Sequence, residues 1–299
     1  MTGIGDDCAV LRWPSREDAL VTTDFSLEGI HFRREWHPPE VVGHRCLTRG
    51  LSDIAAMGGK PLLAFLSLAL PRNLSQNWVD RFLRGFLALA DEFKVSLAGG
   101  DTAESPAGIL ADIMVLGSVP KGKAILRSSA HPGDRIYVTG KLGGASAALQ
   151  KLFAGQKVRP QDFPRHFHPV PRVAVGRFLR ERGLANAMID LSDGLSTDLA
   201  HICEESAVGA EILASAIPRA TIGRDGNEVE PRHALHGGDD YELLFTAPRG
   251  KRVPRRIAGV PVTLIGHIQR RKNVVLMNDR GIGIELKPQG WQHFSQQTE

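Results

Sequence analysis

Acidic side chains recur beside glycine at the ends of β-rich runs in this sequence. Asp101 follows two glycines in VSLAGGDTAE, and glycine and acid also lie close together in GIGDDCAV, VTTDFSLEGIHF, MIDLSDGL and HGGDDYELLF. One such segment is ordinary turn chemistry, because glycine takes positive φ and aspartate caps its own backbone. Repetition at several strand ends predicts one site assembled from distant segments, in which glycine lets the backbone approach a phosphate closely.

The side chains at these positions are hard oxygen ligands of the kind that suits Mg²⁺. They are the carboxylates and hydroxyls of Asp6, Asp7, Asp24, Asp53, Asp101, Asp190, Asp193, Thr22, Thr23, Thr102 and Ser192. In proteins, Mg²⁺ commonly bridges carboxylates and substrate phosphates. Carboxylates gathered without a cation would repel one another and raise one another's pKa. If the segments converge, the sequence therefore predicts bound metal.

Ser192 and Asp193 precede an apolar-periodic segment that contains Leu195, Leu199 and Ile202. A helix that starts here offers free amides and a positive dipole end, which can hold a phosphate. The alternative is plain N-capping by Ser192 or Asp193. This segment alone leaves both interpretations open.

Other catalytic signatures are absent from the sequence. It has no HExxH, no GxSxG, no GxGxxG after a strand, and no Cys or His cluster at zinc spacing. GSVPKGKA has the glycine and GK spacing of a P-loop, but Ala124 replaces the hydroxyl residue that would bind Mg²⁺, and Pro120 removes an amide. This segment is predicted to be a loop.

Periodicity indicates the elements that must position the acids. A helix is predicted over 75–94, with Ser75 as N-cap and an aromatic stripe facing the core. In a second helix, over 39–58, Asp53 lies opposite the packing face and so faces solvent or something polar. Further helices are predicted over 143–153, 172–182 and 195–207, and strands over 19–23, 62–70, 95–98, 110–118, 135–139, 187–190, 241–246 and 262–266. Alternating strands and helices indicate a mixed α/β or α+β class, and the turn-rich RSSAHPGD at 127–134 is the best domain boundary.

Composition limits the function classes. With 299 residues and 42% hydrophobic content, the chain is long enough for two domains and a sizeable core. Its net charge of +4 and basic clusters at 252–256 and 269–272 fit anionic ligands, yet such runs are usually solvated, and no recognition helix or aromatic RNA-binding signature accompanies them. We expect no nucleic-acid partner. The apolar run at 61–71 is shorter than the roughly 20 residues of a membrane span, so no membrane association is expected.

The cysteines and the N-terminus favour a cytoplasmic protein. Cys8, Cys46 and Cys203 form no CxxC pair, which is typical of reduced thiols rather than of a disulfide framework. The start MTGIGDDCAV has neither the basic nor the apolar region of a secretory signal.

Taken together, these segments resemble the thiamine-monophosphate kinases, members of a superfamily that includes aminoimidazole ribonucleotide synthetase, selenophosphate synthetase and a hydrogenase maturation protein. The eight matching segments, in family order, are GIGDDCAVL, TTDFSLEGIHF, LSDIAAMGG, LAGGDTAES, LRSSAHPGDRIYVTG, IDLSDGLSTDLAHI, GGDDYELLF and GWQHF. They extend from Gly3 to Phe294, so the resemblance covers nearly the whole chain.

The resemblance implies a two-domain fold like that of aminoimidazole ribonucleotide synthetase. Residues 1–128 would form an α/β domain that binds ATP and Mg²⁺ and pairs its sheet with that of a second copy in a homodimer. Residues 129–299 would form an α+β domain. The implied activity is direct transfer of the γ-phosphoryl group of ATP to thiamine phosphate.

Site residues follow from the same resemblance. The implied metal ligands are Asp6, Thr22, Thr23, Asp24, Asp53, Asp101, Asp190 and Asp193. The implied nucleotide contacts are Gly100, Asp101, Arg127 and Ser192, and those of thiamine phosphate are His31, Asp239 and Trp291. Asp24, Asp101 and Asp193 are the predicted catalytic residues.

The sequence departs from the family pattern at three places. Asp239 stands where the family more often has glutamate, which shortens that arm by one methylene. Cys8 replaces the more usual alanine, and the chain starts two residues before GIGDD, where the family usually has a helix and a strand.

No general base is required by this chemistry, because an acceptor phosphate with a second pKa of about 6 is already largely an oxyanion at neutral pH.

Two interpretations of Trp291 stay open: stacking on the cationic ring system of thiamine, or closing the core. Two alternative functions also stay open: another ATP-dependent enzyme of the superfamily, and a catalytically silent nucleotide-binding dimer.

Overall fold

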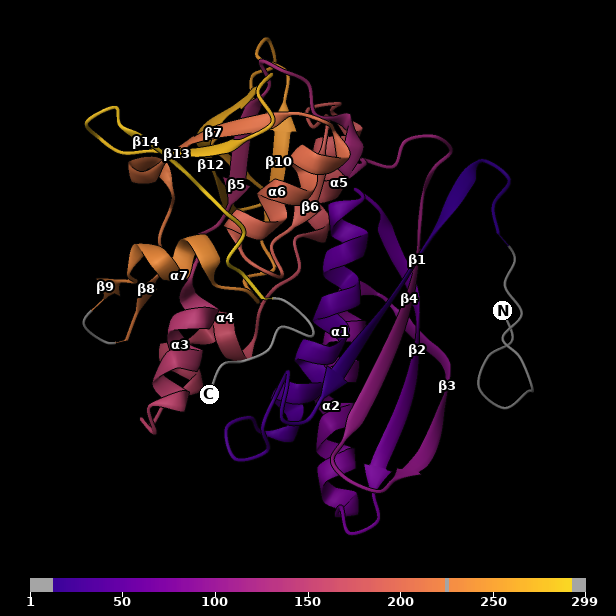
Figure 1. Ribbon diagram of the computed structural model, residues 1–299. Coiled ribbons are helices and arrows are strands. Elements are labelled where there is room, and N and C mark those ends of the chain that lie inside the picture. The colour runs from indigo at the N-terminus through magenta and orange to yellow at the C-terminus, as the bar shows by residue number, and fades with distance from the viewer. Residues whose placement is uncertain (1–12, 224–225, 292–299) are drawn as a thin grey trace. The chain divides into compact units, whose positions relative to one another are not determined.

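The computed structural model describes residues 13–223 and 226–291 (Figure 1). The chain divides into two compact units, Met1–Ala124 and Ile125–Glu299, whereas the sequence placed the division after residue 128. Among the positions named above, Asp6, Asp7, Cys8 and Phe294 lie outside the described residues.

The first unit is a four-stranded sheet with two helices (Figure 1). The strand order is β1-β4-β2-β3, with β2 parallel to β3 and the other two pairs antiparallel. The strands are β1 (Glu17–Leu27), β2 (Lys60–Pro71), β3 (Ser96–Ser105) and β4 (Leu110–Pro120), and the helices are α1 (Pro39–Ala56) and α2 (Gln76–Phe93). Both helices contribute to one apolar core against the sheet.

Local chemistry explains where the helices begin and how closely they pack. Ser75 Oγ accepts a hydrogen bond of 3.3 Å from Trp78 N, which confirms the predicted cap of α2. The aromatic stripe is confirmed as core, since Phe82 and Phe86 are fully buried. At Gly43 of α1, an added Cβ would lie 2.0 Å from the carbonyl oxygen of Phe82, so only glycine permits this approach of the helices.

Strand β3 corrects the prediction for the opening segment. The apolar run was expected to end on the glycines, but β3 continues through Gly99, Gly100 and Asp101 to Ser105. A Cβ at Gly100, where φ is 156°, would lie 1.8 Å from the carbonyl oxygen of Leu66 in β2. The fold itself therefore demands glycine here, because the backbone of the neighbouring strand approaches closely.

The second unit contains an eight-stranded sheet. The strand order is β14-β13-β7-β12-β5-β10-β6, with β11 beside β12; β13 and β7 are parallel and the other pairs are antiparallel. The strands are β5 (Arg135–Thr139), β6 (Met188–Asp190), β7 (Gly209–Leu213), β10 (Leu243–Ala247), β11 (Arg256–Ile257), β12 (Val260–Gln269), β13 (Val274–Met277) and β14 (Gly283–Glu285). A separate hairpin pairs β8 (Thr221–Ile222) with β9 (Asn227–Glu228).

The helices of this unit are α3 (Gly144–Phe153), α4 (Pro164–Phe167), α5 (Val173–Glu181), α6 (Leu195–Glu205) and α7 (Pro231–His236), with single 3₁₀ turns η1 (Arg127–Ser129), η2 (Pro160–Asp162) and η3 (Ala214–Ala216). Helix α6 packs Leu199 and Ile202 against sheet residues such as Ile212 and Ile265 in one core. This packing fixes the start of α6, where Asp193 lies.

Each of the predicted helices and strands overlaps an observed one. The prediction missed β7 and β13, together with α4, α7 and the shortest strands, because runs of two to six residues carry too little periodicity. GSVPKGKA is only partly a loop: Gly117–Pro120 belong to β4, since their backbone pairs with β1.

None of the helices within residues 13–223 and 226–291 has the length and apolar composition that a membrane crossing requires.

Candidate functional site

Strand β1 and helix α1 bring together Thr22, Asp24 and Asp53. Thr22 Oγ1 donates a hydrogen bond to Asp53 Oδ2, so Asp53 faces something polar, which was one of its two predicted settings. Burial, followed by the adjacent negative charge and hydrogen bond of Asp53, raises the pKa of Asp24 to about 7 against the opposing effect of Arg49. Two neighbouring carboxyl groups that resist ionising together have the donor chemistry that a hard cation such as Mg²⁺ prefers.

Thr23 does not join this cluster through its side chain. Alternate residues of a strand face opposite sides of the sheet. Thr23 is exposed, as are Val21 and Phe25, whereas Thr22 and Asp24 are half-buried. The predicted role of Thr23 as a ligand would therefore fall to its backbone.

Sequence reasoning missed two arginines beside this cluster. Arg45, Arg49 and Asp53 are spaced by four residues and share one face of α1. Arg45 and Arg49 border a small cavity with His31, whose Nδ1 accepts a hydrogen bond of 3.0 Å from Leu27 N. The four-residue spacing was the signal, because charged residues at this interval on a largely buried helix mark a polar stripe.

Asp101 lies at the opposite edge of the same sheet. Asp24 pairs with Ile113, Ile113 with Leu66 and Leu66 with Gly100. Three interstrand spacings of about 4.8 Å separate the backbones of β1 and β3 by about 14 Å. The expectation of one assembled site required Asp101 to lie beside Asp24. Within the first unit, the fold keeps these two residues apart.

The second unit does bring most of its predicted residues together. Asp190 ends β6 and is 4% exposed. Asp239 N donates to the carbonyl oxygen of Ser192 over 2.8 Å, and Trp291 N donates to that of Asp193 over 3.2 Å. Strand β6, the start of α6, the loop before β10 and the C-terminal segment thus meet at one place. Trp291 is 41% exposed, so the core-closing interpretation is wrong.

The start of α6 is held by a residue that sequence reasoning missed. The cap residue is Gly194 and no side chain caps it locally, so N-capping by Ser192 or Asp193 is wrong. Instead, Asp198 Oδ2 accepts hydrogen bonds from the amides of Asp193 (3.2 Å) and Gly194 (3.0 Å). Burial raises the pKa of Asp198 well above its ordinary value, and the charges of Asp190 and Asp193 raise it further.

His201 completes a possible donor set with these acids. The ligand atoms of Asp193, Asp198 and His201 all lie within 4.8 Å of one another. The spacing of Asp198 and His201 by three residues on a predicted helix was visible in the sequence and places both on one face.

Arg127 lies elsewhere in this unit. Its carbonyl oxygen accepts a hydrogen bond of 2.8 Å from Ser206 Oγ, just beyond the C-terminal end of α6. Asp193 precedes the other end of this helix, whose 11 residues span about 16 Å at about 1.5 Å per residue. The structure does not place the backbone of Arg127 beside Asp193.

The loop that carries Asp239 is strained and firmly supported. Asp239 and Tyr241 have positive φ values of 64° and 49°, and Tyr241 Oη donates to Asp239 Oδ1 over 2.7 Å. Nearby Glu242, which is fully buried, accepts two hydrogen bonds from Arg172 and one from Arg165, each 2.6–2.7 Å long. Burial alone would raise the pKa of Glu242, but the arginines outweigh it and the pKa is lowered. Strain of this kind is held at functional sites by such surrounding bonds.

The buried carboxyl group of Asp240 should make the free energy of unfolding depend on pH. Burial raises its pKa to about 7 from 3.8, and its Oδ2 accepts a 2.7 Å hydrogen bond from Gly143 N. The folded state holds this proton more tightly than the unfolded state. The resulting stability is fully present below pH 4 and is lost as pH rises through about 7. Asp240→Asn has no carboxylate to ionise, so at pH 8 it should be more stable than the wild type by up to about 4 kcal/mol.

Urea unfolding at pH 5 and pH 8 measures this difference, with the exposed Asp91→Asn as control. The advantage of Asp240→Asn should shrink at pH 5. Equal pH slopes for the wild type and Asp240→Asn would contradict the assignment.

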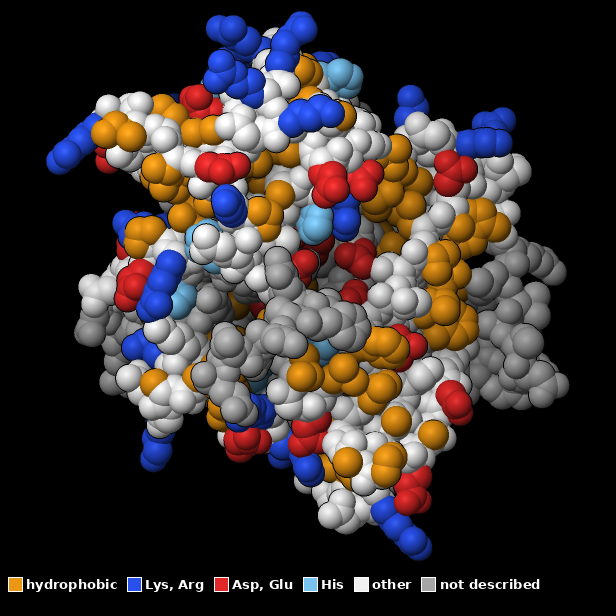
Figure 2. Space-filling model, viewed as in Figure 1, with side chains coloured by type: hydrophobic (Ala, Val, Ile, Leu, Met, Phe, Trp, Pro, Cys, Tyr) orange, Lys and Arg blue, Asp and Glu red, His pale blue; other side chains and the backbone are white. Residues whose placement is uncertain are grey.

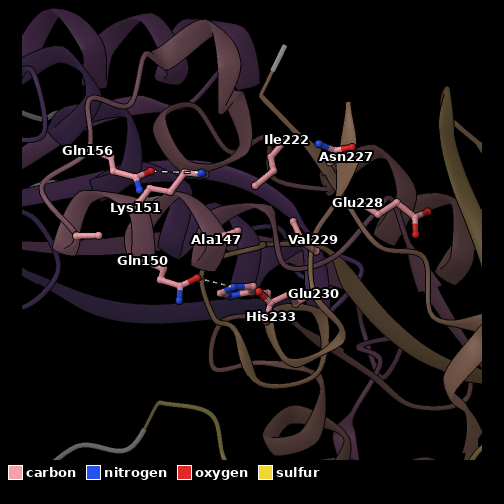
Figure 3. Close-up of a pocket in the computed structure, with 11 residues that line it drawn as sticks. Ala147, Gln150, Lys151, Gln156, Ile222, Asn227, Glu228, Val229, Glu230 and His233 are labelled. Atoms are coloured by element: carbon pink, nitrogen blue, oxygen red, sulfur yellow. Dashed lines mark hydrogen bonds between the residues drawn. The ribbon is translucent and has the colours of Figure 1, made fainter. Parts of the chain in front are cut away.

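A cavity of about 330 Å³ lies among α3, the β8–β9 hairpin and α7 (Figure 3). Its central polar group is already hydrogen-bonded: the ring nitrogens of His233 contact Gln150 Oε1 at 2.9 Å and Ser146 Oγ at 3.0 Å. Lys151 Nζ reaches Gln156 Oε1 at 3.4 Å. Since these groups are mutually satisfied and the lining includes none of the predicted site residues, we assign the cavity a structural role.

Comparison with known proteins covers both units. Residues 5–119 match the family model of AIR synthase related protein, N-terminal domain, and residues 131–277 match that of the C-terminal domain. A thiamine-monophosphate kinase of Escherichia coli strain K12 is 38% identical over 307 aligned positions, which cover 98% of this chain and 92% of that protein.

Two solved structures are similar over most of the chain. The thiamine-monophosphate kinase of Stenotrophomonas maltophilia K279a is 36% identical with a TM-score of 0.81, covering 92% of this chain and 90% of that one. A structure described as AaThiL complexed with AMPPCP and TMP is 31% identical with a TM-score of 0.81, covering 98% and 93%.

Proposed function

Because the chain belongs to the thiamine-monophosphate kinase family, we propose that it transfers the γ-phosphoryl group of ATP to the phosphate of thiamine phosphate, giving thiamine diphosphate and ADP. The observation that carries this function is similarity over 98% of the chain to a protein bound to AMPPCP and TMP. The convergence of Asp190, Ser192, Asp193, Asp239 and Trp291 in the second unit supports it.

The donor sets of both units fit Mg²⁺. In the first unit Asp24 and Asp53, with the Thr22 hydroxyl, would hold a cation, which would offset the repulsion between the two carboxylates. In the second unit Asp190 and Asp193 would do so, with Asp198 fixing the Asp193 backbone. When bound, Mg²⁺ neutralises the charge of phosphate oxygens. Asp6, Thr23 and Asp101 are proposed as further ligands from the family resemblance.

The remaining residues would bind and align the two substrates. Ser192 lies at the start of α6, where backbone amides and the helix dipole favour the phosphates of ATP; Gly100, Asp101 and Arg127 would contact the rest of the nucleotide. His31, Asp239 and Trp291 would contact thiamine phosphate. Asp239 is held by the Tyr241 hydroxyl, which limits the motion of this shortened arm.

Incubation of the pure protein with MgATP and thiamine phosphate tests the function. Chromatography should show thiamine diphosphate and ADP in equal amounts, and neither should form when either substrate is omitted. ATP and Mg²⁺ binding without turnover would favour the silent nucleotide-binding dimer. ATP consumption with other acceptors alone would favour another enzyme of the superfamily.

Trp291→Ala should raise the KM for thiamine phosphate far more than the KM for ATP. The Trp291 side chain is 41% exposed, and stacking of its indole on the cationic ring system of thiamine would be worth about 0.5–2 kcal/mol. Steady-state kinetics of both substrates measure the effect. Trp291→Phe keeps an aromatic face and should restore most of the affinity, and equal changes in both KM values would count against stacking.

We also propose a homodimer formed through the face of the first unit's sheet that carries Val21, Phe25 and Met114. These side chains are 60%, 53% and 38% exposed. Together they form a larger exposed apolar surface than singly scattered apolar residues would. The same face carries Asp112 and Asp101, which lie in one row across β4, β2 and β3.

Phe25→Asp should convert this dimer to a monomer, because it buries a charge in an apolar interface. Light scattering at micromolar concentration measures the mass. Phe153→Asp, at a side chain that is 63% exposed on α3, is the matched control and should leave the mass unchanged. A wild-type monomer would refute the proposal.

We place the enzyme in the cytoplasm. Cys46 and Cys203 are free and buried, as is common for thiols in reducing compartments.

A further inference from the structure

The two basic clusters noted in the sequence lie at the same end of the second unit's sheet. Strands β10 and β12 flank β5 and are both antiparallel to it, so they run in the same direction and finish at the same end of the sheet. The loop after β10 carries Arg249, Lys251, Arg252 and Arg255, and the turn after β12 carries Arg270, Arg271 and Lys272. Figure 2 shows Lys and Arg side chains gathered at the top of the view, where the arrowhead of β10 points in Figure 1.

These seven cationic side chains form no ion pairs within the described part of the chain. All are exposed, and none of their side chains pairs with a carboxylate among residues 13–223 and 226–291. Unpaired cations crowded at one end repel one another and attract anions. The arrangement therefore favours an anionic partner.

A cavity of about 490 Å³ opens at this end. Ala247 pairs with Arg135, Arg135 with His267, and His267 with Glu211, so these four residues form one row across β10, β5, β12 and β7. Directly opposed residues share a face of the sheet. The other face of the same strands carries Ile136, Ile212 and Ile268 into the core.

The lining combines charge with apolar surface. Arg135, Arg249 and His267 supply hydrogen-bond donors from three neighbouring strands or their ends. Leu213 and Leu264 supply an apolar wall and are 46% and 45% exposed. Glu211 is the one acid among the described residues that line the cavity. Its negative charge would repel an anion and so favour binding at the arginine end.

We propose that this cavity binds an organic phosphate, with the phosphate against Arg135, Arg249 and His267 and the apolar part of the molecule against Leu213 and Leu264. The planar fork of arginine matches phosphate oxygens two at a time. The volume suits a small metabolite. A nucleic acid is disfavoured, because no Phe, Tyr or Trp is among the described residues that line the cavity, and these are the side chains that stack best on bases.

The arginine end of this cavity is distinct from Asp190 in the same unit. Asp190 pairs with Leu243, the first residue of β10, whereas Arg135 of the cavity pairs with Ala247, the last residue of that strand. The four intervening steps of about 3.3 Å separate the two by about 13 Å along the strand.

Binding of inorganic phosphate and phenyl phosphate tests the inference. Calorimetry with the full chain in EDTA keeps divalent cations away from the acidic clusters. Phenyl phosphate should bind more tightly than phosphate. The double variant Arg135→Ala and Arg249→Ala should weaken both ligands about tenfold or more, since each arginine gives charge-assisted hydrogen bonds. Leu264→Ser should weaken only phenyl phosphate.

Matched variants separate this site from general electrostatics and from the kinase site. Lys121→Ala with Lys123→Ala removes two exposed charges of the first unit and should leave both affinities unchanged. Arg249→Ala alone changes only an exposed loop residue, so it tests the site if the double variant misfolds. The double variant should keep wild-type kinase activity.

Three results would overturn the inference. They are equal binding of phosphate and phenyl phosphate by the wild type, equal weakening by the lysine control, and loss of phenyl phosphate binding on Asp239→Ala. Displacement of phenyl phosphate by a single-stranded oligoribonucleotide at lower concentration would assign the surface to nucleic acid instead.

Discussion

Replacing Asp24 with Asn should lower kcat by about a hundredfold or more, because even residues that only orient metal ligands change activity by about 10–100-fold. The amide removes the charge that would hold Mg²⁺ beside Asp53 while keeping the size of the side chain. The same substitution should leave the protein as stable as the wild type or more stable at pH 8, because it removes a buried carboxylate whose pKa is raised to about 7.

The opposite directions of these two effects make the prediction specific. Steady-state turnover of MgATP and thiamine phosphate measures the first effect, and urea unfolding in EDTA measures the second. Asp91→Asn, on the exposed side of α2, is the control and should change neither quantity. Undiminished turnover would refute the assignment of Asp24 as a ligand, and a loss of stability would show that the residue is structural.

Replacing Glu242 with Ala should lower the free energy of unfolding by about 3–5 kcal/mol, as for other buried ion pairs that lose one partner. Glu242 is fully buried and accepts hydrogen bonds from Arg165, Arg172 and Thr139. Its loss would leave the largely buried Arg172 without a counter-charge in a low-dielectric environment.

Urea unfolding at pH 7 measures this change against Glu181→Ala. Glu181 also contacts two arginines, Arg177 and Arg180, but it is 51% exposed, so its loss should cost less than about 1 kcal/mol. Similar losses for the two variants would show that burial does not strengthen the Glu242 network.

Much of the local structure could be predicted from the sequence. The stripe from Trp78 to Phe93 repeats at helical spacing, and burial of that stripe needs no knowledge of distant segments. Ser75 caps α2 through a contact three residues away, which is equally local. The family could also be inferred, since motifs in a fixed order survive in the sequence whatever their arrangement in space.

The candidate site was predicted in part, and its errors have one origin. Asp53 was expected to face solvent or a polar neighbour, and only the fold showed that this neighbour is Thr22. Asp198 was missed because a carboxylate in the first turn of a helix resembles ordinary surface charge until its bonds to the amides of Asp193 and Gly194 are seen. Both contacts depend on how the chain folds back.

By itself the sequence determined which chemistry this protein has available: carboxylates and hydroxyls near strand ends, two amphipathic helices and a full set of family motifs. The tertiary structure alone decided which of those carboxylates meet. Strand order places β1 and β3 at opposite edges of one sheet, so Asp101 lies far from Asp24, whereas α1 folds back to set Asp53 against β1. Strand order depends on hydrogen bonds between segments distant in sequence, and no local pattern records those partners.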